Sequence, residues 1–330
     1  MEEKALILMT YDLPREWQGD FLKEYRVILS EEDRKGIASN LMANLPDAAG
    51  IFCLLDDPIP AEIIHSAPKL KVISNMAVGV DNIDLGACTR RGIPVGHTPG
   101  VLTDGTADLT MALLLSVCRQ LPKASRDARE GRWSGWNPTG WLGLDLKNAT
   151  VGIIGLGKIG RAVAQRLIGF GARIVFTSKH PKDEAARELN ARQVSLEELL
   201  RTSDIVCLHT ALTKETAGMI DSSAFRIMKE SAVLINAARG SVVVTDDLVA
   251  ALESGLIRAA GLDVTDPEPL PSDHPLYQLE NCLITPHIGS ATYNTRRSMA
   301  EIALQNLAAG LVGHPLPHCA NPEVYQASDS

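Results

Sequence analysis

The clearest chemical pattern in the chain is a glycine-rich turn between an apolar run and an amphipathic run. The segment reads Val151-Gly-Ile-Ile-Gly155-Leu-Gly157-Lys-Ile-Gly160. Gly155 permits a tight turn, Gly157 lets backbone amides reach a pyrophosphate, and Gly160 lets a helix pack closely on a strand. The start of that helix adds a partial positive charge. The pattern predicts a dinucleotide-binding turn in preference to a purely structural one.

The residues after the next apolar run, 173–177, indicate which dinucleotide is bound. Sites for NAD usually place a carboxylate about 20 residues after the glycines, where it bonds the ribose 2′-hydroxyl. This chain has Ser178, Lys179 and His180 instead. No carboxylate repels a 2′-phosphate there, and a hydroxyl and cations can bind one. We therefore expect NADP(H) to be preferred, with NAD(H) as the other possible cofactor and a solvated basic turn as the alternative.

Three more residues of the second half have side chains suited to acid–base chemistry on a small anion. Each follows an expected strand or lies in a loop after one, at the edge where open α/β sheets bind ligands. Arg239 has a planar fork that matches a carboxylate and can polarise a keto oxygen. His287 is a candidate proton donor, and Glu268 could orient its ring and favour the charged form. A surface arginine, a structural histidine and an exposed glutamate are the alternatives.

The segments around these residues resemble a known enzyme family. They are Asn236-Ala-Ala-Arg-Gly240, Gly261-Leu-Asp-Val-Thr-Asp-Pro-Glu-Pro269 and Thr285-Pro-His-Ile-Gly-Ser-Ala291. With the glycine turn, they resemble the D-isomer-specific 2-hydroxyacid dehydrogenases in an order and spacing that run through nearly the whole chain. A tryptophan-rich loop at 131–147, His274-Pro-Leu276 and the residues after Pro286 resemble most the glyoxylate/hydroxypyruvate reductase branch.

The resemblance implies an α/β fold of two doubly wound lobes with parallel sheets. A Rossmann cofactor domain, expected at 101–290, would be inserted into a flavodoxin-like substrate domain made of 1–100 and 291–330, with the active site in the cleft between them. The implied activity is NADPH-dependent reduction of small 2-keto acids, glyoxylate and hydroxypyruvate first, by a homodimer. Hydride would pass to the keto carbon while His287 gives the oxygen a proton.

The resemblance also implies roles for individual residues. The segment Met76-Ala-Val-Gly-Val-Asp81 resembles the family's substrate loop, although an ordinary strand-to-helix turn is the alternative. Trp141 resembles an aromatic that this branch sends into the partner subunit's site, the alternative being packing at the dimer interface alone. The expected substrate-binding residues are Val78, Gly79, Trp141, Arg239, His287 and Ser290. The expected cofactor-binding residues are Thr106, Gly155, Gly157, Lys158, Ile159, Gly160, Ser178, Lys179, His180, Ala211, Thr216, Ala237, Asp263, which would face the nicotinamide, and Gly289.

Other functions known among such proteins fit the sequence less well. Dinucleotide-sensing corepressors of this family carry partner-binding extensions, and this chain ends soon after its last expected helix. Phosphite dehydrogenase has a lysine where this chain has Val78. Phosphoglycerate dehydrogenases commonly add a C-terminal regulatory domain, although short forms exist.

The elements that must position these residues follow from alternating apolar and amphipathic runs, which predict βαβ units. Strands are expected near 4–9, 49–55, 71–75, 93–96, 150–155, 173–177, 204–208, 232–236, 258–262 and 282–285. Helices are expected near 31–44, 60–66, 82–91, 103–121, 161–170, 245–255 and 292–310, with a capping box at Ser195–Glu198. Three tryptophans in the irregular segment 131–147 indicate an interface.

Composition agrees with a cytoplasmic globular enzyme. The chain has 330 residues, a formal charge of −8 and 45% hydrophobic residues, which oppose a nucleic-acid partner and exclude a disordered chain. No apolar run approaches the roughly 20 residues of a membrane span, and the N-terminus lacks the features of a signal peptide. The six cysteines form no Cys-x-x-Cys pair, so we expect reduced thiols and no metal site.

Overall fold

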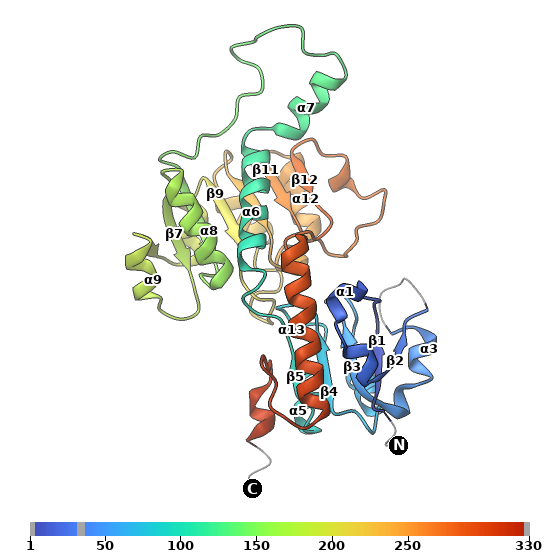
Figure 1. Cartoon of the computed structure of the whole chain (residues 1–330). Coiled ribbons are helices and arrows are strands. Elements are labelled where there is room, and N and C mark those ends of the chain that lie inside the picture. The colour runs from blue at the N-terminus through green and yellow to red at the C-terminus, as the bar shows by residue number, and fades with distance from the viewer. Residues whose placement is uncertain (1–3, 32–36, 327–330) are drawn as a thin grey trace. The chain divides into compact units, whose positions relative to one another are not determined.

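The computed structural model describes residues 4–31 and 37–326, which fall into two compact units. One unit comprises residues 1–102 and 292–330, and the other comprises residues 103–291. The second unit is therefore inserted into the chain of the first (Figure 1). The boundaries expected from the sequence differ from these by one or two residues.

The first unit is built on a five-stranded sheet in which every strand pair is parallel. Its strands are β1 (Leu6–Met9), β2 (Arg26–Leu29), β3 (Ala48–Cys53), β4 (Val72–Asn75) and β5 (Val95–Gly96), in the order β2-β1-β3-β4-β5. This is the strand order of flavodoxin-like sheets. Parallel strands buried on both faces need apolar side chains throughout, as in β1, whose four residues are all buried.

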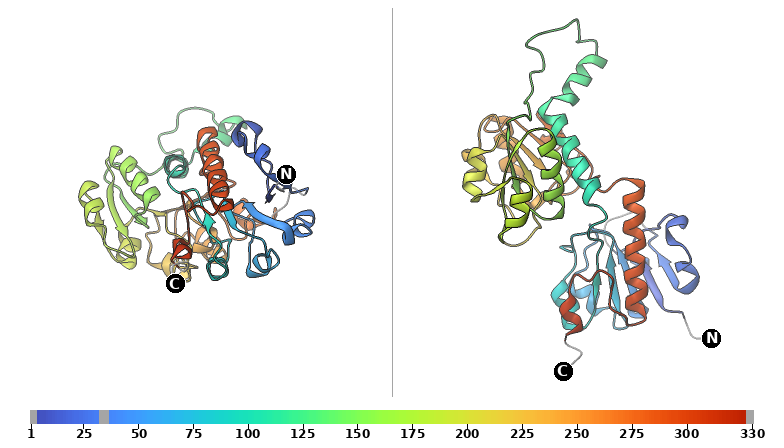
Figure 2. Two further views of the ribbon diagram at one scale, coloured as in Figure 1. Left: turned by 60° about the horizontal axis from the view of Figure 1, so that its bottom comes forward. Right: turned by 60° about the vertical axis from the view of Figure 1, so that its left-hand side comes forward.

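Helices cover both faces of this sheet. The short helices are α1 (Arg15–Gln18), α2 (Phe21–Glu24), α3 (Ser39–Met42), α4 (Ala61–His65) and α5 (Leu85–Arg90), with 3₁₀ turns at Leu45–Asp47 and Pro322–Tyr325. The long helix α13 (Tyr293–Leu311) packs on β3 and β4 (Figure 2). A Cβ at Gly310 would come within 2.5 Å of Val72, and Ser74 donates a hydrogen bond to the carbonyl of Ala303 at 2.8 Å. The close contact fixes the C-terminal helix on this sheet.

The second unit is built on a seven-stranded parallel sheet. Its strands are β6 (Thr150–Ile154), β7 (Arg173–Thr177), β8 (Arg192–Gln193), β9 (Ile205–Leu208), β10 (Val233–Asn236), β11 (Ala259–Leu262) and β12 (Cys282–Ile284), in the order β12-β11-β10-β9-β6-β7-β8. The chain leaves β6 toward β7 and β8 and then returns to place β9 on the other side of β6. This reversal is the point where doubly wound sheets bind their ligands, at the carboxyl ends of the strands.

Two layers of helices enclose the second sheet. Helices α6 (Thr103–Cys118) and α8 (Lys158–Gly169) share one buried cluster with Ile153, Ile205 and Cys207. The opposite cluster includes Val206 and Leu208 and is covered by α10 (Leu196–Thr202), α11 (Ser222–Ile227) and α12 (Thr245–Glu253). The remaining short elements are α9 (Asp183–Glu188) and 3₁₀ turns at Gly240–Val242 and Pro275–Tyr277.

An arm extends from the second unit. Gln120 follows α6 in a left-handed conformation, which separates α6 from the next helix. That helix, α7 (Leu121–Arg129), has a proline in its first turn. Figure 1 shows α7 and the loop after it reaching away from the rest of the unit. The loop returns where Arg258 donates to the carbonyl of Leu142 at 2.6 Å and the amide of Leu144 donates to Cys118 at 2.9 Å.

The predicted fold class is confirmed, and several local predictions need correction. The first helix of the second unit ends at Cys118, short of residue 121, and the glycine turn leads into a helix that begins at Lys158. The prediction missed the strands β2 and β8 and the helices α1, α2, α7, α9 and α11. The expected helix at 31–44 is only α3 within the described part, and its residues 32–36 lie outside that part. All six cysteines are free thiols, and burial raises the pKa of Cys118 to about 12.

Candidate active site

The glycine turn has the geometry that the sequence predicts for it. Gly155 has a φ of 95°, and a Cβ there would come within 2.6 Å of the carbonyl oxygen of His209. A Cβ at Gly160 would come within 2.2 Å of the Gly155 carbonyl, so helix and turn require glycine at both points. Gly157, by contrast, has no atom within 4 Å of its Cβ position. The space in front of Gly157 is open, and no side chain caps α8 there.

The residues predicted to bind a 2′-phosphate, Ser178, Lys179 and His180, directly follow β7. Ser178 is half-buried there, while Lys179 and His180 are exposed. Across from it, the loop after β9 is held by Thr216, whose hydroxyl donates to the carbonyl of Ala211 at 2.7 Å. Glu215 of this loop lies within electrostatic range of Lys179. Its pKa is lowered chiefly by the Thr213 hydroxyl and further by Lys179.

Arg239 lies on a short loop after β10, which is held by the side chain of Asn236 and by a close backbone contact at Gly240. The buried Asn236 donates to the carbonyl of Arg239 at 2.9 Å and accepts from the amide of Ala238 at 3.0 Å. A Cβ at Gly240 would come within 1.9 Å of the carbonyl of Thr265, so the loops after β10 and β11 touch at this glycine. The guanidinium is half-buried and donates to the Ala238 carbonyl at 2.9 Å.

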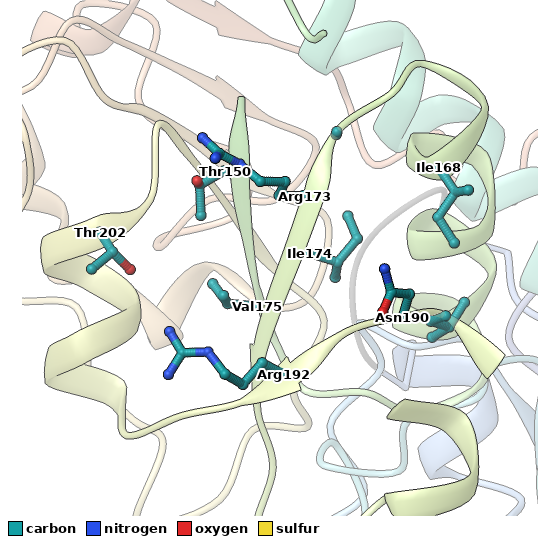
Figure 3. A pocket seen from close by; sticks show the side chains of 10 residues that line it. Thr150, Ile168, Arg173, Ile174, Val175, Asn190, Arg192 and Thr202 are labelled. Atoms are coloured by element: carbon teal, nitrogen blue, oxygen red, sulfur yellow. The ribbon is translucent and has the colours of Figure 1, made fainter. Parts of the chain in front are cut away.

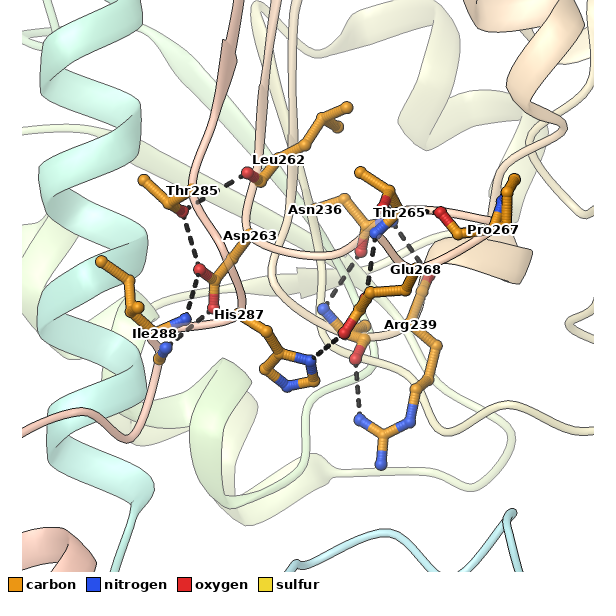
Figure 4. A network of polar contacts seen from close by, with 12 residues as sticks. Asn236, Arg239, Leu262, Asp263, Thr265, Pro267, Glu268, Thr285, His287 and Ile288 are labelled. Carbon is orange, nitrogen blue, oxygen red and sulfur yellow. Dashed lines mark hydrogen bonds and ion pairs between the residues drawn. The ribbon is translucent and has the colours of Figure 1, made fainter. Parts of the chain in front are cut away.

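The loop that carries the histidine is organised by Asp263. This buried carboxylate accepts from the amide of Ile288 and from the amide of Gly289, both at 2.8 Å, and from the hydroxyl of Thr285 at 2.7 Å (Figure 4). Burial raises its pKa, and those hydrogen bonds oppose the rise. Asp263 therefore positions the loop; the expectation that it also faces a nicotinamide remains a prediction.

The imidazole of His287 is paired with Glu268. Nδ1 of His287 lies 2.6 Å from Oε1 of Glu268, and the other oxygen of that carboxylate accepts from the amide of Thr265 at 3.1 Å. His287 itself has a φ of 51°, which is uncommon outside glycine and marks a constrained position. Figure 4 shows the ring, the carboxylate and the Arg239 side chain on the same side of this sheet edge.

This pairing decides which ring nitrogen can act on a ligand. Because Glu268 accepts a hydrogen bond from Nδ1, the proton that can be transferred is carried by Nε2. The pair can therefore donate a proton beside an arginine that can hold and polarise an anion.

Other predicted residues of the second unit border the same sheet edge. Gly289 lies against Thr106 of α6, since a Cβ there would come within 3.4 Å of the Thr106 hydroxyl. Ala237 directly follows β10, and Ser290 follows Gly289; both are half-buried. Lys158 and Ile159 form the first turn of α8.

The predicted substrate loop belongs to the first unit. The side chain of Asn75 donates to the carbonyl of Gly79 and to the side chain of Asn82, both at 2.9 Å, and the ring of His97 bonds the Val78 carbonyl at 3.0 Å. Within residues 4–31 and 37–326, no hydrogen bond from the amide of Val78 or Gly79 is found. The loop thus has its Val78 and Gly79 carbonyls hydrogen-bonded, while the amides of the same two residues have no hydrogen bond within the described part of the chain.

Trp141 lies at the base of the arm loop. Its indole N–H donates to Asp127 at 2.8 Å, and this bond, followed by those from Arg132, lowers the pKa of that carboxyl. Trp133 and Trp136 are 65% and 88% exposed. The arm thus fixes Trp141 and leaves two large aromatics uncovered in the chain.

A pocket of about 520 Å³ lies elsewhere in the second unit (Figure 3). It is lined by Thr150, Arg173 and Arg192, which begin β6, β7 and β8, so it lies at the edge opposite to the carboxyl ends. None of the predicted site residues lines it. In the described part of the chain, no group of three or more His, Cys, Asp or Glu side chains is arranged to hold a metal ion, and no helix there is long and apolar enough to cross a membrane.

Comparison with known proteins decides the family. The NAD-binding domain of D-isomer-specific 2-hydroxyacid dehydrogenases matches residues 111–289. The human glyoxylate reductase/hydroxypyruvate reductase is 49% identical over 282 residues, which are 85% of this chain and 86% of that protein. The chain belongs to the D-isomer-specific 2-hydroxyacid dehydrogenases. It is therefore an oxidoreductase that uses a nicotinamide dinucleotide.

Solved structures of similar proteins share the fold of this 2-hydroxyacid dehydrogenase. A protein from Thermus thermophilus has a TM-score of 0.87 at 46% identity, covering 96% of this chain and 100% of that one. The NADPH-dependent glyoxylate/hydroxypyruvate reductase of Sinorhizobium meliloti, solved with NADP and malonate, has a TM-score of 0.86 at 30% identity and covers 97% and 98%. The open space at Gly157 and the uncapped amides of α8 fit the pyrophosphate of such a cofactor.

Proposed function

We propose that this dehydrogenase reduces glyoxylate and hydroxypyruvate, with NADPH as its preferred cofactor. The observation that carries the proposal is the pairing of His287 with Glu268 at 2.6 Å on the sheet edge that also carries Arg239. The names of the human and Sinorhizobium relatives support the choice of substrates. The bound dinucleotide supplies the hydride that the keto carbon receives.

The chain's own residues complete the reduction. Nε2 of the protonated His287 gives its proton to the keto oxygen as the carbon gains the hydride, and Glu268 stabilises the imidazolium before the transfer. Arg239 pairs with the substrate carboxylate and polarises the carbonyl. The open amides of Val78 and Gly79 support a second hold on that carboxylate. We assign the first unit to substrate and the second to cofactor.

The preference for NADPH rests on the end of β7. Ser178, Lys179 and His180 offer a hydroxyl and cationic groups and no carboxylate. Glu215 partly opposes them, because it lies within electrostatic range of Lys179. We propose a preference for NADPH, with use of NADH retained.

The arm supports a homodimer. Leu121 and Leu142 are exposed to 51% and 61% beside the uncovered tryptophans, and an aromatic-rich arm of this kind is typical of protein interfaces. We propose that the arm pairs with a second copy, that Trp141 contributes to the partner's substrate site, and that the enzyme acts in the cytoplasm.

The proposal is tested by steady-state kinetics with glyoxylate, hydroxypyruvate, pyruvate, phosphite and 3-phosphoglycerate, each with the reduced or oxidised forms of both cofactors. The expected result is the highest kcat/KM for glyoxylate or hydroxypyruvate with NADPH. Turnover of phosphite or 3-phosphoglycerate in preference would contradict the substrate assignment. Dinucleotide binding without measurable turnover would favour a corepressor-like binding protein.

A further inference from the structure

His209 is a buried titratable residue that the proposed chemistry does not use. It directly follows β9, and its amide donates to the carbonyl of Ile154 at 2.8 Å, one residue before the glycine turn. Its carbonyl oxygen is the atom against which a Cβ at Gly155 would collide. The backbone of His209 therefore packs directly against the glycine turn.

The alternation of side chains along β9 places the ring of His209 on the face of the sheet that α6 and α8 cover. Ile205 and Cys207 belong to the cluster under α6 and α8, whereas Val206 and Leu208 belong to the opposite cluster. Side chains alternate along a strand, so His209 continues the row of Ile205 and Cys207. Helix α8, which begins at the glycine turn, covers that face.

The ring of His209 has hydrogen-bonding groups that the protein leaves unused. Both Nδ1 and Nε2 are buried, and within the described residues neither has a hydrogen-bond partner. Burial lowers the pKa of the ring to about 4, so the imidazole is neutral at physiological pH. A neutral imidazole presents one N–H donor and one acceptor, and buried groups of this kind nearly always find partners.

We propose that His209 is a further cofactor-binding residue, whose ring hydrogen-bonds the pyrophosphate–ribose backbone of the dinucleotide beside the glycine turn. Although both ring nitrogens are buried, the residue as a whole is half-buried and directly adjoins the turn. The proposal rests on dinucleotide binding by this family. It is independent of the preferred cofactor and of the keto acid.

The test compares binding to the enzyme without turnover. NADH and ADP-ribose share the backbone in question, and ADP-ribose lacks the nicotinamide. His209→Phe keeps an aromatic ring but removes both hydrogen-bonding groups, and His209→Gln restores a donor and an acceptor. We expect His209→Phe to weaken both ligands about tenfold by calorimetry, with no fall in the Tm of the ligand-free protein. His209→Gln should recover part of the loss.

Leu208→Met is the matched control, since it alters packing in the same strand on the opposite face and should leave both Kd values unchanged. Equal binding by His209→Phe and wild type, or a loss for NADH alone, would overturn the proposal. Should the phenylalanine variant fold poorly, the ring ¹⁵N resonances of His209 in the wild-type protein decide instead. They should move to hydrogen-bonded values on adding ADP-ribose, and unchanged resonances would refute the contact.

Discussion

At the scale of single residues, Glu268 determines what His287 can do. The carboxylate occupies Nδ1 at 2.6 Å and leaves Nε2 to face a ligand. Asp263 acts one step further away, because it holds the amides of Ile288 and Gly289 and so fixes the backbone that carries the ring. Glu268 thus orients the ring of His287, and Asp263 positions the loop that carries it.

Replacing Glu268 by Gln should slow reduction. The change keeps the shape of the side chain but removes the negative charge beside the ring that gives the proton, so kcat for the keto acid should fall by about tenfold or more, with little change in the Kd for NADPH. Steady-state kinetics measure the loss. An unchanged kcat would mean that Glu268 does not support the proton donor.

Replacing His287 by Ala should remove the proton donor itself. We expect a loss of about 10²–10⁴ in kcat, with little change in the Kd for NADPH because the glycine turn is untouched. A parallel titration of NADPH fluorescence provides the control. A variant that retains most of its activity would assign proton transfer to another group.

Replacing Ser178 by Asp should reverse or abolish the preference for NADPH. The new carboxylate would repel a 2′-phosphate and could bond the 2′-hydroxyl of NADH. The ratio of kcat/KM values for the two cofactors measures the effect, and Glu215→Gln should move that ratio in the opposite direction. Wild-type enzyme that prefers NADH would refute the role of Ser178.

At the scale of elements, the sequence predicted those helices, strands and turns that depend on residues close together in the chain. The glycine turn, the strands β6, β7 and β10 and the cap at Ser195 were accessible because each depends on neighbouring residues. Strand β2 was missed because its four residues have no buried position, and α7 was missed because Pro122 can start a helix as well as end one. The position of His209 beside the glycine turn depends on a strand pair formed across roughly 50 residues, which no local pattern contains.

The arm gives a prediction at the same scale. If Trp133 and Trp136 pack against a second copy, replacing both by Ser should weaken self-association markedly, because truncating a buried interface aromatic commonly costs about 2 kcal/mol or more. Sedimentation velocity measures the change. Phe170→Ser, which removes an exposed aromatic at the end of α8, is the control. An unchanged dimer in the double variant would place the interface elsewhere.

At the scale of the whole molecule, the neutral ring of His209 couples stability to pH. Its pKa is lowered to about 4 by burial, so the unfolded chain binds a proton below about pH 6.5 that the folded chain does not bind. Stability is therefore lost as the pH falls from about 6.5 toward 4. In denaturant titrations of the ligand-free protein, the advantage of His209→Phe over wild type should grow by about 2–3 kcal/mol between pH 7.5 and 4.5. A constant difference would show that the ring is solvated.

The helix α13 also imposes an order on the synthesis of the molecule. The sheet of the first unit leaves the ribosome early, but the face at Gly50 and Val72 stays bare until Leu307 and Gly310 emerge. At about 5–20 residues per second, the roughly 200 residues in between take about 10 to 40 seconds to translate. The cofactor unit is contiguous and can complete its fold during that interval. The nascent amino-terminal sheet must therefore wait, with one apolar face uncovered, until α13 emerges and packs on it.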